Sequence, residues 1–326
     1  MLEHGGNLAA AAERYGIALS DWIDLSTGIS PYQYPIPAIA DSAWQRLPYD
    51  DDGLIEAARS YYGCEQLLPT AGSQAAIQVL PAMRASCRVA LQQPMYAEHA
   101  QAWRKQGHEV VLFQGIPDEA LLAQCGVLVL CNPNNPTALL HRPEQLLAWH
   151  QRISQHGGWM VVDEAFMDAT PEFSIARYTN LSGLIVLRSL GKFFGLAGAR
   201  VGFLLAAQPL LNEARERLGP WPISGPARII TKAALQDQGW QQATRVLLHQ
   251  QSARLAKLLA LYGLPPQAGT ALFQWVATDR AEVWHAHLAK QGIWTRKFET
   301  PQALRFGLPP ASAWERLEQA QASFSG

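Results

Sequence analysis

Cysteine is scarce in this 326-residue chain, and the positions of the few cysteines argue against several kinds of site. Cys64, Cys87, Cys125 and Cys131 never stand in a Cys-x-x-Cys spacing, so neither a zinc motif nor a disulfide framework is indicated. Cys131 ends an apolar run, where a reduced and buried thiol is the ordinary interpretation. We therefore expect a reducing compartment and no metal.

The chain also lacks long apolar runs and a marked excess of charge of either sign. No stretch approaches the length that crosses a membrane, and the N-terminus has no signal-peptide pattern, which predicts a cytoplasmic protein. The formal net charge is -1 and no long basic run occurs, so we expect no nucleic-acid partner and no polybasic membrane anchor. Internal repeats and low-complexity tracts are absent too. A small molecule remains as the expected partner.

Short apolar runs alternate with helical patterns through the middle of the chain. We expect strands at residues 89–91, 110–113, 127–131, 159–162 and 184–187. Such alternation predicts an α/β fold with a large, mainly parallel, doubly wound sheet, followed by a smaller α/β domain. The predicted parts are an N-terminal segment (1–40) that packs with the small domain at the site entrance, a large domain (41–225) and a small domain (226–326).

Polar side chains follow three of these five apolar runs. Asn135 follows the third run and Asp163 follows the fourth. Ser189 and Lys192 come after the fifth run, in a glycine-rich turn. Ligands bind beyond the carboxyl ends of strands in open α/β sheets, and a lysine there can form a Schiff base with a carbonyl cofactor. A surface lysine in a turn explains Lys192 alone, but three such strand ends together predict a site.

An anion site is also indicated at the start of a helix. Gly72, Ser73 and Gln74 precede a helical pattern, so free backbone N–H groups and the helix dipole favour a phosphate there. The Ser189 hydroxyl and the Arg200 guanidinium are suited to a phosphate as well. For Ser73 alone, an ordinary helix N-cap is the simpler interpretation.

In kind and order, these residues closely resemble the cofactor site of a known superfamily. They are similar to the pyridoxal 5'-phosphate (PLP) site of the fold type I PLP-dependent transferases, the class I/II aminotransferase-like superfamily. The resemblance covers most of the chain and implies PLP as the cofactor and a homodimer with sites between two subunits. It implies cofactor contacts from Gly72, Ser73, Gln74, Tyr96, Asn135, Asp163, Ser189, Lys192 and Arg200.

The resemblance also gives each residue a chemical role. Lys192 would hold the cofactor and then act as free base or acid beside the substrate α-carbon. Asp163 would pair with the pyridine nitrogen and keep the ring an electron sink, which makes these two the predicted catalytic residues. Asn135 would donate to the ring phenolate oxygen, and Tyr96 would stack on the ring. Taken singly, a helix N-cap explains Asp163, an Asn-Pro turn explains Asn135, and core packing explains Tyr96.

Two further segments narrow the resemblance to one kind of enzyme. The opening His4-Gly5-Gly6-Asn7 and the loop at residues 24–31, with the run from Asp163 to Phe166, look like the threonine-phosphate decarboxylase family of cobalamin biosynthesis. The resemblance implies a phosphorylated amino acid as substrate. It implies decarboxylation of L-threonine O-3-phosphate to (R)-1-amino-2-propanol O-2-phosphate.

The same resemblance assigns substrate contacts at both ends of the chain. His4 and the Thr27-Gly28 region would bind the substrate phosphate, and Arg296 and Arg305 would bind the carboxylate. Many relatives have asparagine at the position of Gly28, so a side-chain phosphate contact is lost there and only the backbone remains. Without the resemblance, His4 reads as a disordered terminal residue and Arg305 as a half-exposed strand residue.

Other functions stay open at this point. Aminotransferases of the superfamily commonly have tyrosine where this chain has Phe166, and phenylalanine cannot donate to the cofactor, so transamination is slightly disfavoured. A histidinol-phosphate-type aminotransferase shares nearly every site residue, but it would require a 2-oxo acid acceptor. A cofactor-binding regulator would need a DNA-binding module, and we expect no room for one before the fold. Relatives also bring a tyrosine from the partner subunit, but Tyr49 is displaced in register and is not assigned that role.

Overall fold

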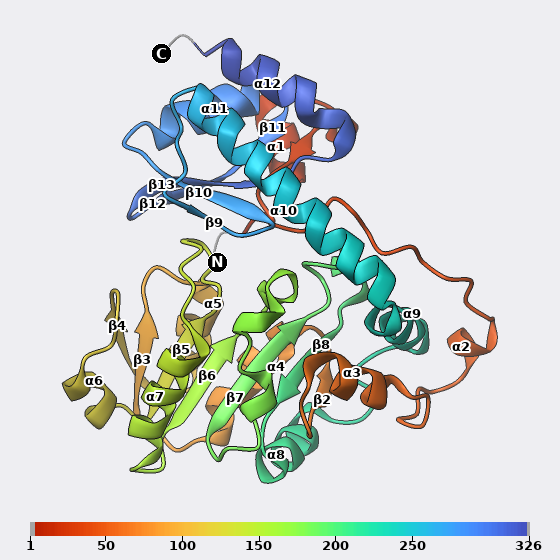
Figure 1. Ribbon diagram of the computed structural model, residues 1–326, viewed down its shortest axis with the longest axis vertical. Coiled ribbons are helices and arrows are strands. Elements are labelled where there is room, and N and C mark those ends of the chain that lie inside the picture. Colours follow the sequence, from red (N-terminus) through yellow and green to blue (C-terminus); the bar gives the residue numbers. More distant parts are fainter. Residues whose placement is uncertain (1–3, 325–326) are drawn as a thin grey trace. The chain divides into compact units, whose positions relative to one another are not determined.

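The computed structural model describes residues 4–324 and divides the chain into two compact units. The large unit comprises residues 34–135 and 139–241, and the small unit comprises residues 1–33, 136–138 and 242–326. The sequence predicted boundaries after residues 40 and 225, and the main divisions here fall after residues 33 and 241. Each unit has a sheet of its own, so each is described separately (Figure 1).

The large unit is built on a 7-stranded sheet in the order β2-β8-β7-β6-β5-β3-β4. Only β8 runs against its neighbours β2 and β7, and the other pairs are parallel, which confirms the predicted mainly parallel sheet. The strands are β2 (Leu68–Thr70), β3 (Arg88–Gln92), β4 (Glu109–Phe113), β5 (Val127–Cys131), β6 (Trp159–Asp163), β7 (Leu184–Ser189) and β8 (Gly202–Leu205).

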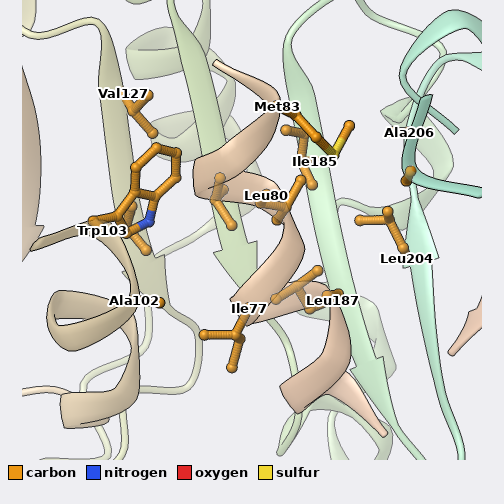
Figure 2. Packing of buried hydrophobic residues seen from close by; sticks show 14 of the residues in the cluster. Ile77, Leu80, Met83, Ala102, Trp103, Val127, Ile185, Leu187, Leu204 and Ala206 are labelled. Atoms are coloured by element: carbon orange, nitrogen blue, oxygen red, sulfur yellow. The ribbon is translucent and has the colours of Figure 1, made fainter. Parts of the chain in front are cut away.

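Buried side chains cover both faces of this sheet, as its continuous apolar runs require. On one face, Val129, Val161 and Ile185 pack with Ile77 and Trp103 in a core cluster (Figure 2). Residues that alternate with these along the strands are buried on the opposite face, among them Ala90, Leu128, Met160, Val162 and Val186. Because the central strands are buried on both faces, the residues that follow their carboxyl ends are held in fixed positions.

Short helices connect the strands of the large unit. Several begin or end at the residues that local chemistry favours: Pro143 starts α7, and Gly63 ends α3 in the left-handed conformation. The α-helices are α2 (Ser42–Gln45), α3 (Leu54–Tyr62), α4 (Ser73–Val79), α5 (Ala97–Lys105), α6 (Glu119–Gln124), α7 (Pro143–Ser154), α8 (Gln208–Leu218) and α9 (Gly225–Gln236), and α10 (Gln238–Leu261) follows. The 3-10 turns are η2 (Leu80–Met83), η3 (Met167–Ala169), η4 (Pro171–Phe173), η5 (Ala176–Tyr178) and η6 (Ala197–Ala199).

The small unit contains a 4-stranded antiparallel sheet and a separate parallel pair of strands. The sheet has the order β12-β13-β10-β9, and the pair joins β1 to β11. The strands are β1 (Ile23–Asp24), β9 (Ala268–Gly269), β10 (Phe273–Ala277), β11 (Ile293–Trp294), β12 (Arg296–Glu299) and β13 (Gln302–Gly307). The helices are α1 (Leu8–Tyr15), η1 (Leu19–Asp21), α11 (Ala281–Lys290), η7 (Ala311–Ala313) and α12 (Trp314–Ala322). Between residues 4 and 324, no helix is long and apolar enough to cross a membrane.

Candidate active site

A cavity of about 70 Å³ lies in the large unit beyond the carboxyl ends of β5, β6 and β7. The three strands are neighbours in the sheet, so the polar residues that follow them meet at one edge. Six of the predicted cofactor residues line this cavity: Ser73, Tyr96, Asn135, Asp163, Ser189 and Lys192. Their roles in binding a cofactor stay predictions, but the structure does bring them together.

The Lys192 amine faces an aromatic ring inside this cavity. Its Nζ lies 5.4 Å from the centre of the Phe166 ring, within cation–π range. Phe166 is buried and carries no polar atom, so this wall of the cavity offers the amine no hydroxyl partner. The neighbouring polar groups around Lys192 therefore come from the strand ends rather than from residue 166.

The Asp163 carboxylate receives hydrogen bonds from two directions. His99 Nε2 lies 3.0 Å from Asp163 Oδ2, and the backbone N–H of Ala165 donates to Oδ1 over 3.0 Å. An ionised carboxylate only accepts hydrogen bonds, so His99 must carry its proton on Nε2 in this contact. Both side chains are buried, and the two donors fix the direction in which the carboxylate points. No local pattern in the sequence singles out His99, which lies three residues after Tyr96 in the first turn of α5.

Tyr96 presents its ring to the cavity while its hydroxyl bonds elsewhere. The hydroxyl donates to Gln74 Oε1 over 3.2 Å, and Gln74 Nε2 donates to Glu98 Oε2 over 2.8 Å. Burial, reinforced by the nearby charges of Glu98 and Asp163, raises the pKa of Tyr96 to about 12, so the phenol stays neutral. These contacts hold the ring in place and leave its face for stacking. Gln74 supports Tyr96 through its side chain, a contact that the sequence did not predict.

The turn before α4 packs closely against Arg200. Gly72 has a φ of 72°, and a Cβ added there would lie 2.7 Å from Arg200 Nη2. Gly202 is equally confined, because its Cβ would lie 2.4 Å from the backbone nitrogen of Ser73. Two glycines thus let a guanidinium, a strand and the first turn of α4 approach one another closely. Arg200 itself has a φ of 52°, a left-handed conformation at the end of η6.

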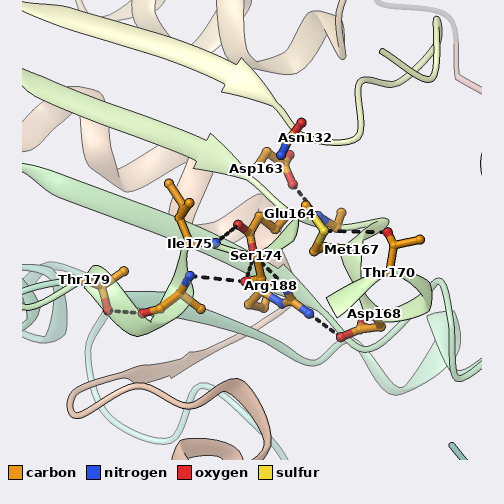
Figure 3. A network of polar contacts seen from close by, with 12 residues as sticks. Asn132, Asp163, Glu164, Met167, Asp168, Thr170, Ser174, Ile175, Thr179 and Arg188 are labelled. Atoms are coloured by element: carbon orange, nitrogen blue, oxygen red, sulfur yellow. Dashed lines mark hydrogen bonds and ion pairs between the residues drawn. The ribbon is translucent and has the colours of Figure 1, made fainter. Parts of the chain in front are cut away.

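A buried ionic network lies next to these residues and holds the segment that follows Asp163 (Figure 3). Arg188 donates to the carboxylates of Asp168 and, over 2.5 Å, Glu164. Glu164 also accepts from Ser174 and from the backbone of Ile175, at 2.5 and 2.9 Å. Burial lowers the pKa of Arg188, but the two carboxylates more than reverse this effect and raise it. The network therefore ties residues 164–175 to β7.

Strand alternation separates this network from the cavity. Arg188 and Ser189 are consecutive residues of β7, so their side chains point to opposite faces of the strand. Arg188 enters the buried network, whereas Ser189 lines the cavity. One short stretch of β7 thus supplies both a structural cation and a hydroxyl of the site.

The residues present fit a phosphate-bearing carbonyl cofactor. The cavity combines an amine, a carboxylate, an amide and hydroxyls, and the glycine turn brings Arg200 against the start of α4. By contrast, the possible metal ligands beside this cavity are poorly suited to a cation. His99, Cys131 and Asp163 do place their ligand atoms within 4.8 Å of one another. Burial raises the pKa of the Cys131 thiol well above its ordinary value, which keeps it protonated and a weak metal ligand.

The remaining predicted residues belong to the small unit, where Arg296 and Arg305 are directly opposite each other on β12 and β13. Burial and the neighbouring charge of Arg296 lower the pKa of Arg305 to about 10, against a smaller raising effect from Asp24. Like charges directly opposite each other destabilise a sheet. Such a pair is suited to binding an anion, which would offset the repulsion.

His4, Thr27 and Gly28 lie in two segments that are linked within the small unit. The N–H of Gly6 donates to Ser26 Oγ over 2.8 Å, which joins the His4 segment to the residue before Thr27. Thr27 also lines an open cavity of about 540 Å³ in this unit. Gly28 has a φ of 63°, in the left-handed region that glycine and asparagine populate most readily. The backbone at this position therefore suits both the glycine here and the asparagine expected in many relatives.

The chain is similar to one protein family over most of its length and to two threonine-phosphate decarboxylases. Residues 21–323 match the family described as aminotransferase class I and II. A threonine-phosphate decarboxylase from Pseudomonas aeruginosa is 53% identical over 99% of this chain and 98% of its own length. A threonine-phosphate decarboxylase from a Sinorhizobium species is 41% identical over 96% of this chain and 95% of its own length.

A solved structure shows the same fold. The crystal structure of histidinol-phosphate aminotransferase from Sinorhizobium meliloti, in complex with pyridoxal-5'-phosphate, superposes with a TM-score of 0.84. The match covers 99% of this chain and 96% of the other, at 21% identity. The predicted fold class, an α/β fold of this superfamily, is therefore confirmed.

Proposed function

The chain belongs to the aminotransferase class I and II family, and from this premise we propose that it decarboxylates L-threonine O-3-phosphate. The products are carbon dioxide and (R)-1-amino-2-propanol O-2-phosphate. The observation that carries the proposal is the full-length similarity to the Pseudomonas decarboxylase, which extends through both units. The buried phenyl ring at Phe166 supports it, because this residue cannot donate the hydrogen bond that tyrosine supplies in many aminotransferases.

The cofactor is PLP, and the large unit supplies the residues that would hold it. When bound, PLP supplies an electron sink for the electron pair left on the substrate α-carbon as carbon dioxide departs. Lys192 would hold its aldehyde carbon, Asp163 its ring nitrogen and Asn135 its phenolate oxygen, with Tyr96 against the ring. Its phosphate would be held by Ser73, Ser189, Arg200 and the backbone of residues 72–74, where the glycines leave room.

Lys192 and its surroundings would then complete the reaction. Its Nζ holds a proton and delivers it to the α-carbon at the position that the carboxylate has left. His99 keeps Asp163 directed at the ring nitrogen by its hydrogen bond to Oδ2. Phe166 carries no proton to give, and its raised pKa makes the buried Cys131 thiol a weak acid, so neither of these two residues competes with the amine as the proton donor.

The small unit would recognise the two charged ends of the substrate. Arg296 and Arg305 bind the carboxylate, and the repulsion between their guanidinium groups is relieved when they do so. His4 and the backbone of Thr27 and Gly28 bind the phosphate. We further place the reaction in cobalamin biosynthesis, on the strength of the N-terminal motif, since an amine bearing a phosphate suits the nucleotide loop of that molecule.

We also infer that the protein is a homodimer that associates through the large unit. Trp44 is 70% exposed and Tyr49 is 68% exposed, although both are large aromatic residues. Asp50 and Asp52 pair with the buried Arg228, so the segment that carries Tyr49 is held firmly. Exposed aromatic groups on a fixed segment are typical of protein interfaces. Light scattering of the purified protein and of Trp44→Glu tests the proposed homodimer. We expect the wild type to be a dimer and Trp44→Glu to dissociate at higher protein concentration. A monomeric wild type would contradict the proposal.

The proposed reaction is tested without any 2-oxo acid present. The purified protein, loaded with PLP, is incubated with L-threonine O-3-phosphate while carbon dioxide and the amine product are both measured. We expect the two in equal amounts, and neither from Lys192→Ala. Turnover only with histidinol phosphate and a 2-oxo acid would contradict the proposal and identify an aminotransferase.

A further inference from the structure

Ser26 connects three segments of the small unit through all of its polar atoms. Its hydroxyl oxygen accepts from the N–H of Gly6 over 2.8 Å and donates to Asp24 Oδ1 over 2.6 Å. Its backbone N–H donates to the same carboxylate oxygen over 2.8 Å, and its carbonyl accepts from Arg305 Nη2. The residue is 0% exposed.

The direction of each hydrogen bond is fixed by the chemistry of the partners. A backbone N–H can only donate and a carboxylate can only accept, so the single Ser26 hydroxyl proton must point at Asp24. A hydroxyl that donates to a carboxylate becomes a better acceptor, because bonds in such a chain polarise one another. The charge of Asp24 therefore strengthens the bond that holds Gly6.

The close approach of residues 5 and 6 to Ser26 also requires glycine at both positions. A Cβ added at Gly5 would lie 2.4 Å from the carbonyl oxygen of Ser26. Gly6 has a φ of 86°, which disfavours other residues. The segment that begins at His4 can therefore lie against residues 24–28 only because two successive residues lack side chains. Leu25 is held from both sides as well, by Trp294 and by Gly307, at 2.8 and 2.6 Å.

We propose that Ser26, oriented by Asp24, is a positioning residue that holds the His4 segment and Arg305 in one fixed arrangement for substrate recognition. This inference rests on the proposed function, in which His4 binds the phosphate and Arg305 binds the carboxylate. Because one residue holds both, it sets the separation at which the two charged ends of a substrate are recognised.

Ser26→Ala tests the proposal by removing the hydroxyl and leaving the carbonyl in place. We expect KM for L-threonine O-3-phosphate to rise about 10-fold, as loss of about 1.4 kcal/mol of binding predicts, while kcat changes less than about 2-fold. Asp24→Asn keeps the shape and an acceptor but loses the charge, and it should raise KM by a smaller factor. If Ser26→Ala folds poorly, Asp24→Asn tests the same hydrogen bond in its place.

Ser30→Ala is the matched control. Ser30 is also buried, at 4% exposure, and lies in the same loop, but among residues 4–324 its hydroxyl bonds to the backbone of Tyr32 and not to the His4 segment or Arg305. We expect its kinetic constants to stay within about 2-fold of the wild type. An equal rise in KM for Ser30→Ala, or an equal loss of kcat and kcat/KM in Ser26→Ala, would show a merely structural role and overturn the proposal.

Hydrogen exchange gives a readout that does not depend on the reaction. Amide exchange at Gly6 should quicken in Ser26→Ala but not in Ser30→Ala, while exchange in β13 stays unchanged. Unchanged exchange at Gly6 would overturn the proposal even if KM rises. If the wild type releases no carbon dioxide, the proposed function fails, and the exchange experiment still decides whether Ser26 holds the His4 segment.

Discussion

Replacing Arg305 by methionine should leave the substrate-free protein at least as stable as the wild type, although the residue is only 5% exposed. Its guanidinium is buried opposite Arg296, and these two effects lower its pKa to about 10. A lowering of this size corresponds to about 3 kcal/mol of unfavourable free energy for the charged group. Losing the bond to the Ser26 carbonyl costs about 2 kcal/mol, so we expect a net gain of about 1 kcal/mol.

Arg188→Met is the matched control, because it makes the same change at another buried arginine. Arg188 has two carboxylate partners, Glu164 and Asp168, and its removal leaves both of them buried without their cation. Breaking a buried ion pair in this way costs about 3–5 kcal/mol. The same substitution is therefore expected to raise the free energy of unfolding at position 305 and to lower it at position 188.

Urea unfolding of the three proteins measures these differences, and ligand binding provides the second half of the test. L-threonine O-3-phosphate should stabilise the wild type and should not stabilise Arg305→Met. Because the pKa of Arg305 is lowered on folding, the unfolded chain keeps its proton at pH values where the folded chain has lost it. The penalty in the wild type is therefore complete below about pH 10 and is progressively relieved as the pH rises from there toward the ordinary pKa of arginine, so the advantage of Arg305→Met should stay constant up to about pH 10 and shrink above it. A loss of about 3 kcal/mol or more in Arg305→Met would refute the reasoning.

Four further experiments test the site. Lys192→Ala should lower kcat by at least about 10²-fold to 10⁴-fold, as loss of the proton donor predicts, and steady-state release of carbon dioxide measures it. Gly72→Ala places a Cβ 2.7 Å from Arg200 Nη2, at a φ of 72° and a ψ of 163° that essentially only glycine adopts, so Arg200 must move away from the start of α4. PLP affinity by fluorescence titration should then fall about 5-fold or more, as loss of about 1 kcal/mol of binding predicts; unchanged affinity would argue against the cofactor phosphate at this turn. Phe166→Tyr restores a hydroxyl donor and should increase the slow transfer of the amino group to the cofactor, followed spectroscopically during turnover. Burial lowers the pKa of His141, so its contribution to stability is present above about pH 6.5 and is lost as pH falls below it; urea midpoints should fall more steeply with pH in the wild type than in His141→Gln.

The sequence predicted the sheet of the large unit well because its strands are buried on both faces. A run such as Val127–Cys131 contains only apolar residues and a thiol over five positions, a length and composition that favour a buried strand over a helix. The small unit offers no such clear pattern, and its structure divides residues 293–299 between β11 and β12 at Thr295. The hydroxyl of Thr295 contacts His285 over 2.8 Å, a tertiary contact that no local pattern reveals.

The candidate site was predictable where strand ends carry polar residues, and less so where one residue acts through another. Asn135, Asp163 and Lys192 each follow an apolar run, and they do line one cavity. His99 and Ser26 could not be recognised in the same way. Each makes its contact with a residue distant in the sequence or with a turn whose geometry depends on the folded chain. Arg305 was expected to be half exposed if it stood alone, but its burial opposite Arg296 supports the anion-binding interpretation.

The alternation of Arg188 and Ser189 on β7 limits how this segment can change in evolution. Inserting or deleting one residue within the strand would turn every later side chain to the other face. The hydroxyl would then enter the buried network and the guanidinium would enter the cavity, so two functions would be lost in a single event. Variation in length between homologues should therefore lie outside β7, so that the stretch Leu184–Ser189 keeps its length.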